Sequence, residues 1–427
     1  MGENLLILHL SDIHFRKNEF KTTQDPNYHL RNELILDARE QCLKLGSPHA
    51  VIISGDIAFA GEEEEFNFAT EWLTKLCNAC GCNTDSIFVV PGNHDVVRSV
   101  ADANVVKMVH DQIKKSNNPR KEIDRQLADP DARTYLYKSL VNYNNFASKY
   151  QCALSPPDNT RAIRTLTLND GSLLRLWGVN TTFVSSSADK QGDLFVDTAT
   201  LQIPREDGVI NLVVGHHDLS WIRQQRELAD HLSHVAPIQM FGHVHTNRIT
   251  MERDFIRLIA SAAIPEREEA GWEPGYNLIH ISVEGQSTNR KLNIHTHVRV
   301  WQTAPSGFRA KMDKEDPIFK HSIALPDWNP PQLPMAHSDG PIQLAQEPEV
   351  TLDEKLDDPL ALRNLIYRFS RLSFSTKTII AKQLGLLEND ELRLPTKEQF
   401  RHVASRARER GLLDKLKDAV AAAELNK

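Results

Sequence analysis

The chain has 427 residues, carries a net charge of −7 at pH 7, and is 40% hydrophobic and 25% charged. Its length corresponds to about three domains of roughly 150 residues, or to one large α/β domain that takes most of the chain. The composition is that of a soluble globular protein that can bury a substantial core. The negative charge excludes the overall basic character that is usual for nucleic-acid-binding proteins, although a local basic groove stays open.

Residues 1–15 contain no basic segment, and their short apolar run is typical of a strand. We therefore expect neither a signal peptide nor a membrane span. Five cysteines fit a reducing compartment without disulfides, so we expect a cytoplasmic protein. Cys77, Cys80 and Cys82 lie close together, but no second cysteine pair follows at zinc-ribbon spacing, which favours buried thiols over a metal site.

Short apolar runs predict buried strands. They lie at residues 5–11, 50–55, 87–92, 173–180, 209–215, 237–242 and 256–263. Helical patterns at residues 30–45 and 63–80 separate the first strands, and this alternation predicts an α/β fold. Residues 276–285 and 291–301 alternate apolar and polar side chains, which predicts a hairpin with one wetter face.

A polar, mostly helical insertion is predicted at about residues 97–161. It contains several basic residues and four of the seven tyrosines, namely Tyr135, Tyr137, Tyr143 and Tyr150. These helices are either simply solvated, or they cap an active site with a basic and aromatic lining. The sequence leaves both interpretations open.

The chain is rich in proline after residue 326, which predicts an extended linker at 326–352. Helical periodicity then returns, for example in the apolar spacing of Leu412, Leu416, Ala419 and Val420. We therefore expect an α/β domain at 1–325, the linker, and a small all-α bundle at 353–427.

Metal-binding side chains follow five of the predicted strands at the point where each strand ends. They are Asp12 and His14, Asp56, Asn93 and His94, His216 and His217, and His243 and His245. Glycine precedes four of these five clusters and permits a sharp turn. Because such strand ends gather along one edge of an α/β sheet, we expect the five segments to face one cleft.

Carboxylate, amide and imidazole ligands without thiolate suit divalent manganese, with iron, zinc or nickel as alternatives. The set is too large for one ion. It suits two ions about 3.5–4 Å apart that share a bridging carboxylate.

These motifs resemble those of the calcineurin-like metallophosphoesterase superfamily, and within it the cyclic-nucleotide phosphodiesterase-like branch. The motifs that carry the resemblance are Asp12-Ile13-His14, Gly55-Asp56, Gly92-Asn93-His94-Asp95, Gly215-His216-His217 and Gly242-His243-Val244-His245. The resemblance covers about residues 5–300. It implies a four-layered αββα sandwich of two mixed sheets, in which residues 256–301 supply late strands of the second sheet.

The resemblance also implies roles for single residues. One metal ion would bind Asp12, His14, Asp56 and His245, and the second would bind Asp56, Asn93, His216 and His243. His94 would act on the scissile phosphate, with Asp95 orienting its imidazole. His217 and Asp218 match the motif less clearly and are left out of the metal ligands.

The implied activity is hydrolysis of a phosphodiester, in a nucleotide or a nucleic acid, by hydroxide bridging two metal ions. The residues "GDIAFAG" and "GNHD" depart from the GD-x-x-D-R-G and GNHE patterns of the superfamily's protein phosphatases, which argues against a phosphoprotein substrate. The alternative is a non-catalytic, nucleotide-sensing or adaptor protein that acts through its helical tail. That alternative predicts the loss of ligands, whereas every ligand is present.

Residues 355–425 are similar to the effector-associated, death-like domains of bacterial conflict and signalling proteins, on the segments "FSTKTIIAKQLGLL" and "LPTKEQFRHVASRARERGLLDKL". This resemblance implies a protein partner that carries a like domain. A generic helical bundle that packs on the enzyme or forms a homo-oligomer is the alternative.

Overall fold

The structure, a computed structural model, describes residues 4–329 except 21, 24 and 270, and then residues 365, 368–369, 372, 374–387 and 403–425. The chain divides into two units, Met1–Gln332 and Leu333–Lys427. From residue 330 onward, the predicted linker at 326–352 lies outside the described residues. Within the described residues, no helix combines the length and apolar character needed to cross a bilayer.

Seven strands form the first sheet, in the order β12-β11-β10-β1-β2-β3, with β13 paired to β11. β1, β2 and β3 run parallel to one another. Every residue of these three strands is buried, which is why each appears in the sequence as a continuous apolar run. The strands are β1 (Leu5–Leu10), β2 (Ala50–Ile53), β3 (Ile87–Val89), β10 (Gly275–Glu284), β11 (Lys291–Thr303), β12 (Ser306–Ala310) and β13 (Phe319–Ala324).

The second sheet has six strands in the order β4-β5-β6-β7-β9-β8. β5, β6, β7 and β9 are parallel, so their carboxyl ends lie along one edge. The strands are β4 (Arg161–Thr167), β5 (Leu173–Val179), β6 (Val209–Val214), β7 (Ile238–Phe241), β8 (Arg248–Met251) and β9 (Ile256–Ile259). Two mixed sheets with accompanying helices confirm the predicted α/β fold class.

One prediction about the sheets is wrong in part. Residues 256–301 were expected to complete the second sheet, but only β9 joins it. β10 pairs with β1 in the first sheet, with Leu5 opposite Ile281, and β11 follows as the predicted hairpin partner. Alternating side chains predict a strand with one wetter face, but they do not specify which sheet the strand joins.

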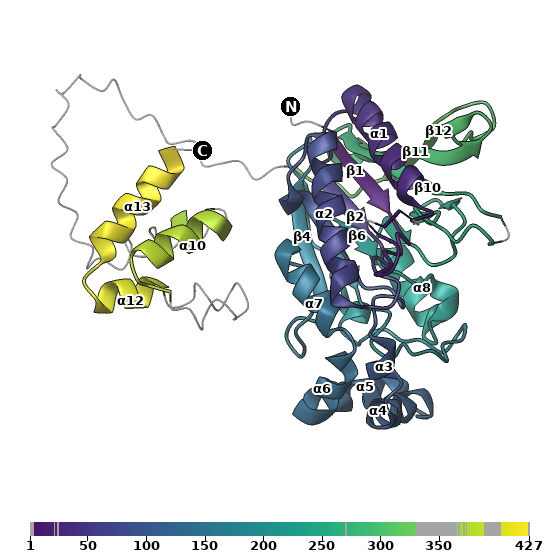
Figure 1. The fold of residues 1–427 in the computed structure, drawn as a ribbon. Helices are drawn as coiled ribbons and strands as arrows, with labels where there is room; N and C mark the ends of the chain where they lie inside the picture. Colours follow the sequence, from purple (N-terminus) through teal and green to yellow (C-terminus); the bar gives the residue numbers. More distant parts are fainter. Residues whose placement is uncertain are drawn as a thin grey trace, which may run out of the picture. The chain divides into compact units, whose positions relative to one another are not determined.

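The helices α1 (Tyr28–Leu45) and α2 (Glu63–Cys80) lie side by side in front of β1 and β2 (Figure 1). α2 begins with a capping box in which the Glu62 and Glu65 side chains bind each other's backbone N–H groups. The helix α8 (Gln225–Val235) precedes β7 in the chain. A continuous hydrophobic core joins both sheets and includes Leu8, Phe88 and Met240.

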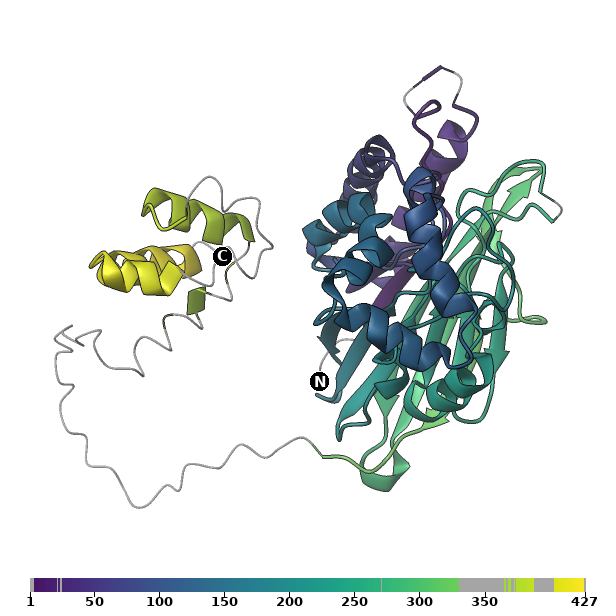
Figure 2. The same ribbon diagram turned by 90° about the horizontal axis from the view of Figure 1, so that it is seen from below.

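The region predicted as an insertion forms short helices at one end of the first unit (Figures 1 and 2). They are α3 (Arg98–Ala101), α4 (Asn104–Lys114), α5 (Pro119–Ala128), α6 (Pro130–Lys138) and α7 (Val141–Ala147). Tyr137, Tyr143 and Tyr150 are buried in the core, and Tyr135 is half-buried. These tyrosines therefore pack the insertion and do not line a cleft.

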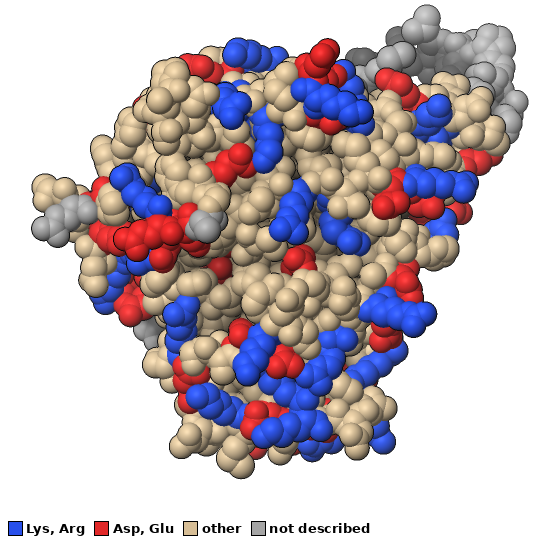
Figure 3. All heavy atoms as spheres, turned by 90° about the vertical axis from the view of Figure 1, so that its right-hand side faces the viewer, with Lys and Arg blue, Asp and Glu red and all other residues tan. Residues whose placement is uncertain are grey.

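Several basic side chains of the insertion are engaged in ion pairs. Lys107, Lys114, Lys115, Arg120 and Arg125 pair with Asp102, Asp189, Asp111, Glu227 and Glu122, respectively. Figure 3 shows acidic side chains lying between basic ones over this part of the surface. On this face the insertion therefore does not present the unbroken basic surface that suits a phosphate backbone.

The second unit is helical where it is described. It contains α10 (Phe374–Gln383), α12 (Val403–Glu409) and α13 (Leu413–Leu425). Its own hydrophobic cluster includes Ile380, Leu387, Leu416 and Val420. The apolar spacing seen in the sequence is therefore the buried face of these helices.

The Tyr143→Phe substitution should lower the free energy of unfolding of the first unit by about 1–3 kcal/mol. The buried Tyr143 hydroxyl donates a hydrogen bond of 3.1 Å to the Val89 carbonyl oxygen, at the end of β3. All six tryptophans lie before residue 333, so tryptophan fluorescence during urea unfolding reports on this unit alone. The control Tyr135→Phe should change stability by less than about 0.5 kcal/mol. Equal effects of the two substitutions would contradict the anchoring role of Tyr143.

Candidate metal centre

The backbone turns sharply where the predicted ligands follow their strands. Five of them adopt left-handed conformations, whereas only three other non-glycine residues described in the structure do so. Each such residue costs roughly 1–3 kcal/mol and persists only where surrounding structure enforces it. The φ angles are 53° at Asp12, 53° at His14, 52° at Asp56, 68° at His243 and 58° at His245.

Two glycines in the motifs allow loops from different strands to approach closely. A Cβ atom at Gly92 would lie 2.1 Å from Oδ1 of Asp56, and one at Gly55 would lie 2.5 Å from Nδ1 of His216. Gly55 also has a φ of 93°, which favours glycine. Glycine is therefore required at these two positions, because any side chain there would clash with a predicted ligand on a neighbouring loop.

The first predicted group of ligands comes together at the ends of β1, β2 and β7. Nε2 of His14 lies 3.4 Å from Oδ2 of Asp56, and Nε2 of His245 lies 3.1 Å from Oδ1 of Asp12. One ligand atom each from Asp12, His14 and His245 lies within 4.8 Å of the others. Asp12 and Asp56 are fully buried, and His14 is nearly so.

The second predicted group comes from both sheets. Nε2 of His216, after β6, lies 3.2 Å from Oδ2 of Asp56 and 3.1 Å from Oδ1 of Asn93. His216 donates its Nδ1–H to the Ser54 carbonyl oxygen at 2.8 Å, and this bond directs Nε2 toward Asp56 and Asn93. The His243 ring lies 5.1 Å from the His216 ring, centroid to centroid. The structure therefore brings all seven predicted ligands to one place.

The buried charges of the centre shift one another's pKa values. Burial alone would raise the pKa values of Asp12 and Asp56, but neighbouring histidines outweigh it and hold both below the usual range. Burial would likewise lower the pKa of His216, but Asp56 raises it to about 9. Burial and the charge of His216 together lower the pKa of His243 to about 4. The carboxylates are thus ionised and available as ligands.

His94 lies at the edge of this cluster, and one of its ring nitrogens is within 4.8 Å of ligand atoms of His14 and Asp56. Its Nδ1–H donates to the Phe59 carbonyl oxygen at 2.7 Å. Asp95 was expected to orient the His94 imidazole, but its contacts are with other residues. The two Asp95 oxygens instead accept the backbone N–H groups of Ala58 and Gly92, each at 2.8 Å. Asp95 therefore ties two loops together, and the Phe59 carbonyl orients His94.

Sequence reasoning missed two side chains at the centre, Glu269 and Arg98, and left a third, His217, out of the metal ligands. His217 is fully buried, its Nδ1 lies 2.9 Å from Oγ1 of Thr181, and its ring joins the group of His216 and His243. Glu269 contacts Nδ1 of His245 with both carboxylate oxygens, at 2.9 and 2.8 Å. The Arg98 guanidinium lies 3.0 Å from Nδ1 of His94. The second histidine of "GHH" is a sequence signal for His217, whereas no motif identifies Glu269 or Arg98.

The donor set fits divalent metal ions. Two donor atoms that bind one cation at about 2.1 Å, at right angles to each other, lie about 3 Å apart. The donor atoms of His14 and Asp56, of His216 and Asp56, and of His245 and Asp12 lie at similar distances, 3.4, 3.2 and 3.1 Å. The buried Nδ1 of His14 has no hydrogen-bond partner within the described part of the chain. Oxygen and imidazole donors without thiolate suit the borderline divalent ions named from the sequence.

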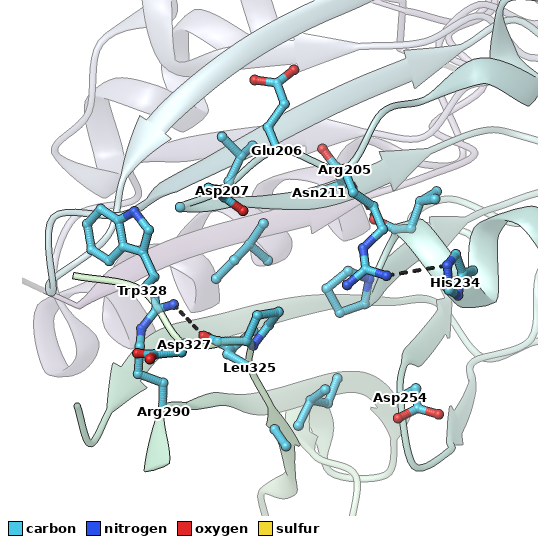
Figure 4. A pocket seen from close by; sticks show the side chains of 18 of the residues that line it. Arg205, Glu206, Asp207, Asn211, His234, Asp254, Arg290, Leu325, Asp327 and Trp328 are labelled. Atoms are coloured by element: carbon cyan, nitrogen blue, oxygen red, sulfur yellow. Dashed lines mark hydrogen bonds between the residues drawn. The ribbon is translucent and has the colours of Figure 1, made fainter. Parts of the chain in front are cut away.

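Other features of the first unit lie outside this centre. Cys77 and Cys80 are buried free thiols, Cys82 is half-buried, and no described metal-binding group includes a cysteine. A cavity of about 790 Å³ is lined by Arg205, His234, Trp328 and others (Figure 4). It lies at the amino end of β6, about one strand length (roughly 20 Å) from His216 at the carboxyl end.

The comparisons with known proteins agree with this geometry. Residues 5–247 match the model of the calcineurin-like phosphoesterase family. Residues 361–422 match the model of the GTPase-associated adaptor domain, at the position where the sequence predicted a helical interaction domain. The chain is 22% identical over 321 residues to the metallophosphoesterase-like protein YydB of Bacillus subtilis strain 168. That alignment spans 71% of this chain and 62% of YydB, which is less than two thirds of the relative's length.

Solved structures resemble the chain only distantly. The purple acid phosphatase PPD1 of yellow lupin is 11% identical with a TM-score of 0.39, covering 77% of this chain and 55% of that one. A putative 5'-nucleotidase of Staphylococcus aureus is 13% identical with a TM-score of 0.34, covering 76% and 55%. These likenesses are too weak to carry an argument about the site. The family model covers more than half of the chain, and the chain therefore belongs to the calcineurin-like phosphoesterase family.

Proposed function

We propose that the first unit is a dinuclear metal-dependent phosphodiesterase that acts on a nucleotide or nucleic acid, and that the tail recruits a protein partner. The observation that carries this proposal is the position of Asp56. Its Oδ2 atom lies 3.4 Å from Nε2 of His14 and 3.2 Å from Nε2 of His216. A single carboxylate oxygen between imidazoles of two sheets is the arrangement expected of a ligand that bridges two cations.

The residues would divide between the two ions as the family resemblance implies. Asp12, His14, Asp56 and His245 would hold one ion, and Asp56, Asn93, His216 and His243 the other. When bound, the pair would supply Lewis acidity that lowers the pKa of water and offsets the charge of the phosphate. The backbone N–H of His94 donates to Oδ1 of Asp56 at 2.7 Å, and this bond fixes the bridging carboxylate against the loop that carries Asn93.

His94 and Arg98 would act on the substrate. Because Nδ1 of His94 is bound to the Phe59 carbonyl oxygen, Nε2 is the nitrogen left to hold a proton toward the leaving oxygen. The exposed Arg98 guanidinium beside this ring adds positive charge where the phosphate would bind. Asp95 would contribute only by holding the two loops in place.

The surface of the insertion bears on the class of substrate. The ion-paired surface of the insertion and its buried tyrosines give little support to a nucleic-acid groove, so a nucleotide phosphodiester is favoured. Metal-loaded protein should be compared on cyclic nucleotides, single-stranded DNA, RNA and phosphomonoesters. Hydrolysis of phosphomonoesters alone would overturn the phosphodiester assignment.

The Asp56→Asn substitution should abolish turnover of bis-p-nitrophenyl phosphate with Mn²⁺. Loss of the shared charge should also lower the Mn²⁺ affinity, which calorimetry measures. We expect the decrease to exceed about 100-fold, the upper end of the range for residues that only orient ligands. Asp218→Asn is the matched control, because Asp218 follows the same strand as His216 but accepts the Ser220 backbone N–H. Unchanged Mn²⁺-stimulated activity in Asp56→Asn would refute the site.

The His94→Ala substitution should reduce kcat by about 10²–10⁴-fold, the range usual for a general acid or base. Calorimetric titration with Mn²⁺ should still find two ions, because His94 is not proposed as a ligand. If the variant has lost its metal, His94 is a metal ligand and its assignment as a proton donor is wrong.

Removal of residues 351–427 should leave kcat/KM for the same substrate within about twofold, because separate domains fold independently. The matched adaptor model suggests a GTPase as the partner that the full chain, but not the truncated one, would bind. A truncated chain that is folded but inactive would overturn the assignment of catalysis to the first unit alone.

A further inference from the structure

The loop between β9 and β10, residues 260–274, runs along the metal centre and lies beyond the part of the chain matched by the phosphoesterase model. Its first residues bind the backbone next to a ligand, since the N–H groups of Ala263 and Ile264 donate to the carbonyl oxygens of Ser11 and Asp12. Arg267 Nη2 donates to the Pro26 carbonyl oxygen at 2.6 Å. The loop is therefore held in place independently of Glu269.

Glu269 approaches His245 on the side opposite the other ligands. Its Oε1 and Oε2 atoms lie 2.9 and 2.8 Å from Nδ1 of His245, while Nε2 of the same ring lies 3.1 Å from Oδ1 of Asp12. The two nitrogens of one imidazole thus face a carboxylate each. One of these carboxylates, Asp12, is a predicted metal ligand and is fully buried.

The contact with Glu269 fixes the role of one His245 nitrogen, Nδ1. An ionised carboxylate only accepts hydrogen bonds, so Nδ1 must donate its N–H to Glu269. Nε2 faces Asp12 in the same way, and a cation shared with Asp12 would take the place of the Nε2 proton while Nδ1 keeps its N–H. His216 is fixed in the same tautomer, but there the acceptor is the Ser54 carbonyl oxygen of the backbone.

An ordinary surface ion pair is the simpler explanation, and the geometry argues against it. The side chains of Glu269 and His245 are only 36% and 23% exposed, and the backbone of His245 is left-handed with a φ of 58°. The backbone conformation fixes where the His245 side chain begins but not the rotation of its ring about the Cβ–Cγ bond. Glu269 is the side chain that fixes this rotation.

We infer that Glu269 is a positioning residue of the metal centre, which holds His245 in the tautomer and orientation that direct Nε2 to the cation shared with Asp12. The inference rests on the proposed dinuclear function. It adds a residue of this chain that acts on the affinity of one of the two ions.

The test is calorimetric titration of the full-length, metal-free protein with Mn²⁺, repeated with Co²⁺ while its visible absorption is recorded. Glu269→Ala should weaken one of the two ions by about 10–100-fold, leave the other unchanged, and alter the Co²⁺ spectrum. Glu269→Gln, whose amide oxygen can still accept the N–H, should recover part of the affinity and serves if the alanine variant does not fold. Glu268→Ala, at the exposed neighbouring position, is the control and should match the unsubstituted protein.

The outcomes separate this inference from the proposed function. If the unsubstituted protein binds no ion, both the dinuclear proposal and the inference about Glu269 are wrong. If the unsubstituted protein binds two ions and Glu269→Ala binds both with equal affinity, only the role of Glu269 is overturned. If Glu268→Ala weakens binding as much as Glu269→Ala, the effect is one of loop charge and the positioning role is also overturned.

Discussion

The pairing of the Asp56 carboxylate is the interaction on which the metal centre depends. This carboxylate is fully buried, and a buried charge without partners would be costly. Its partners come from separate parts of the chain: His14 from the end of β1, His216 from the end of β6, and the backbone of His94 after β3. The shared hydrophobic core packs the two sheets together, and this packing brings their carboxyl ends close enough for the Asp56 charge to be compensated.

The strained backbone at the ligands is stable because the loops support one another. The N–H of Asp12 donates to the Gly55 carbonyl oxygen, and the N–H groups of Ile13 and His14 donate to the carbonyl oxygen of Asp56. The loops after β1 and β2 thus continue the pairing of their parallel strands beyond the strands themselves. Left-handed residues persist when the surrounding structure fixes them in this way, and they concentrate where function needs exact side-chain direction.

Local patterns explain why the strands and the ligands could be predicted. A buried parallel strand appears as an apolar run, and the polar residues that follow it lie at its carboxyl end, so Asp12, Asp56 and His216 could be placed by sequence alone. Partners distant in the chain could not. Nothing in the alternating pattern of β10 shows that it pairs with β1, and no spacing links Glu269 to His245. The role expected of Asp95 failed for the same reason, since the acceptor for His94 is a backbone carbonyl that carries no residue signature.

Two side chains of the loop between β9 and β10 connect it to the candidate metal centre. Glu269 contacts His245 directly, whereas Glu266 pairs with Arg16, whose guanidinium lies 3.5 Å above the Phe59 ring. The carbonyl oxygen of Phe59 accepts the Nδ1–H of His94, so this second route leads to the proposed proton donor. The strand ends fix where the predicted ligand atoms lie, while one loop outside the matched family region contacts His245 directly and is linked to Phe59, the residue that accepts from His94, through Arg16.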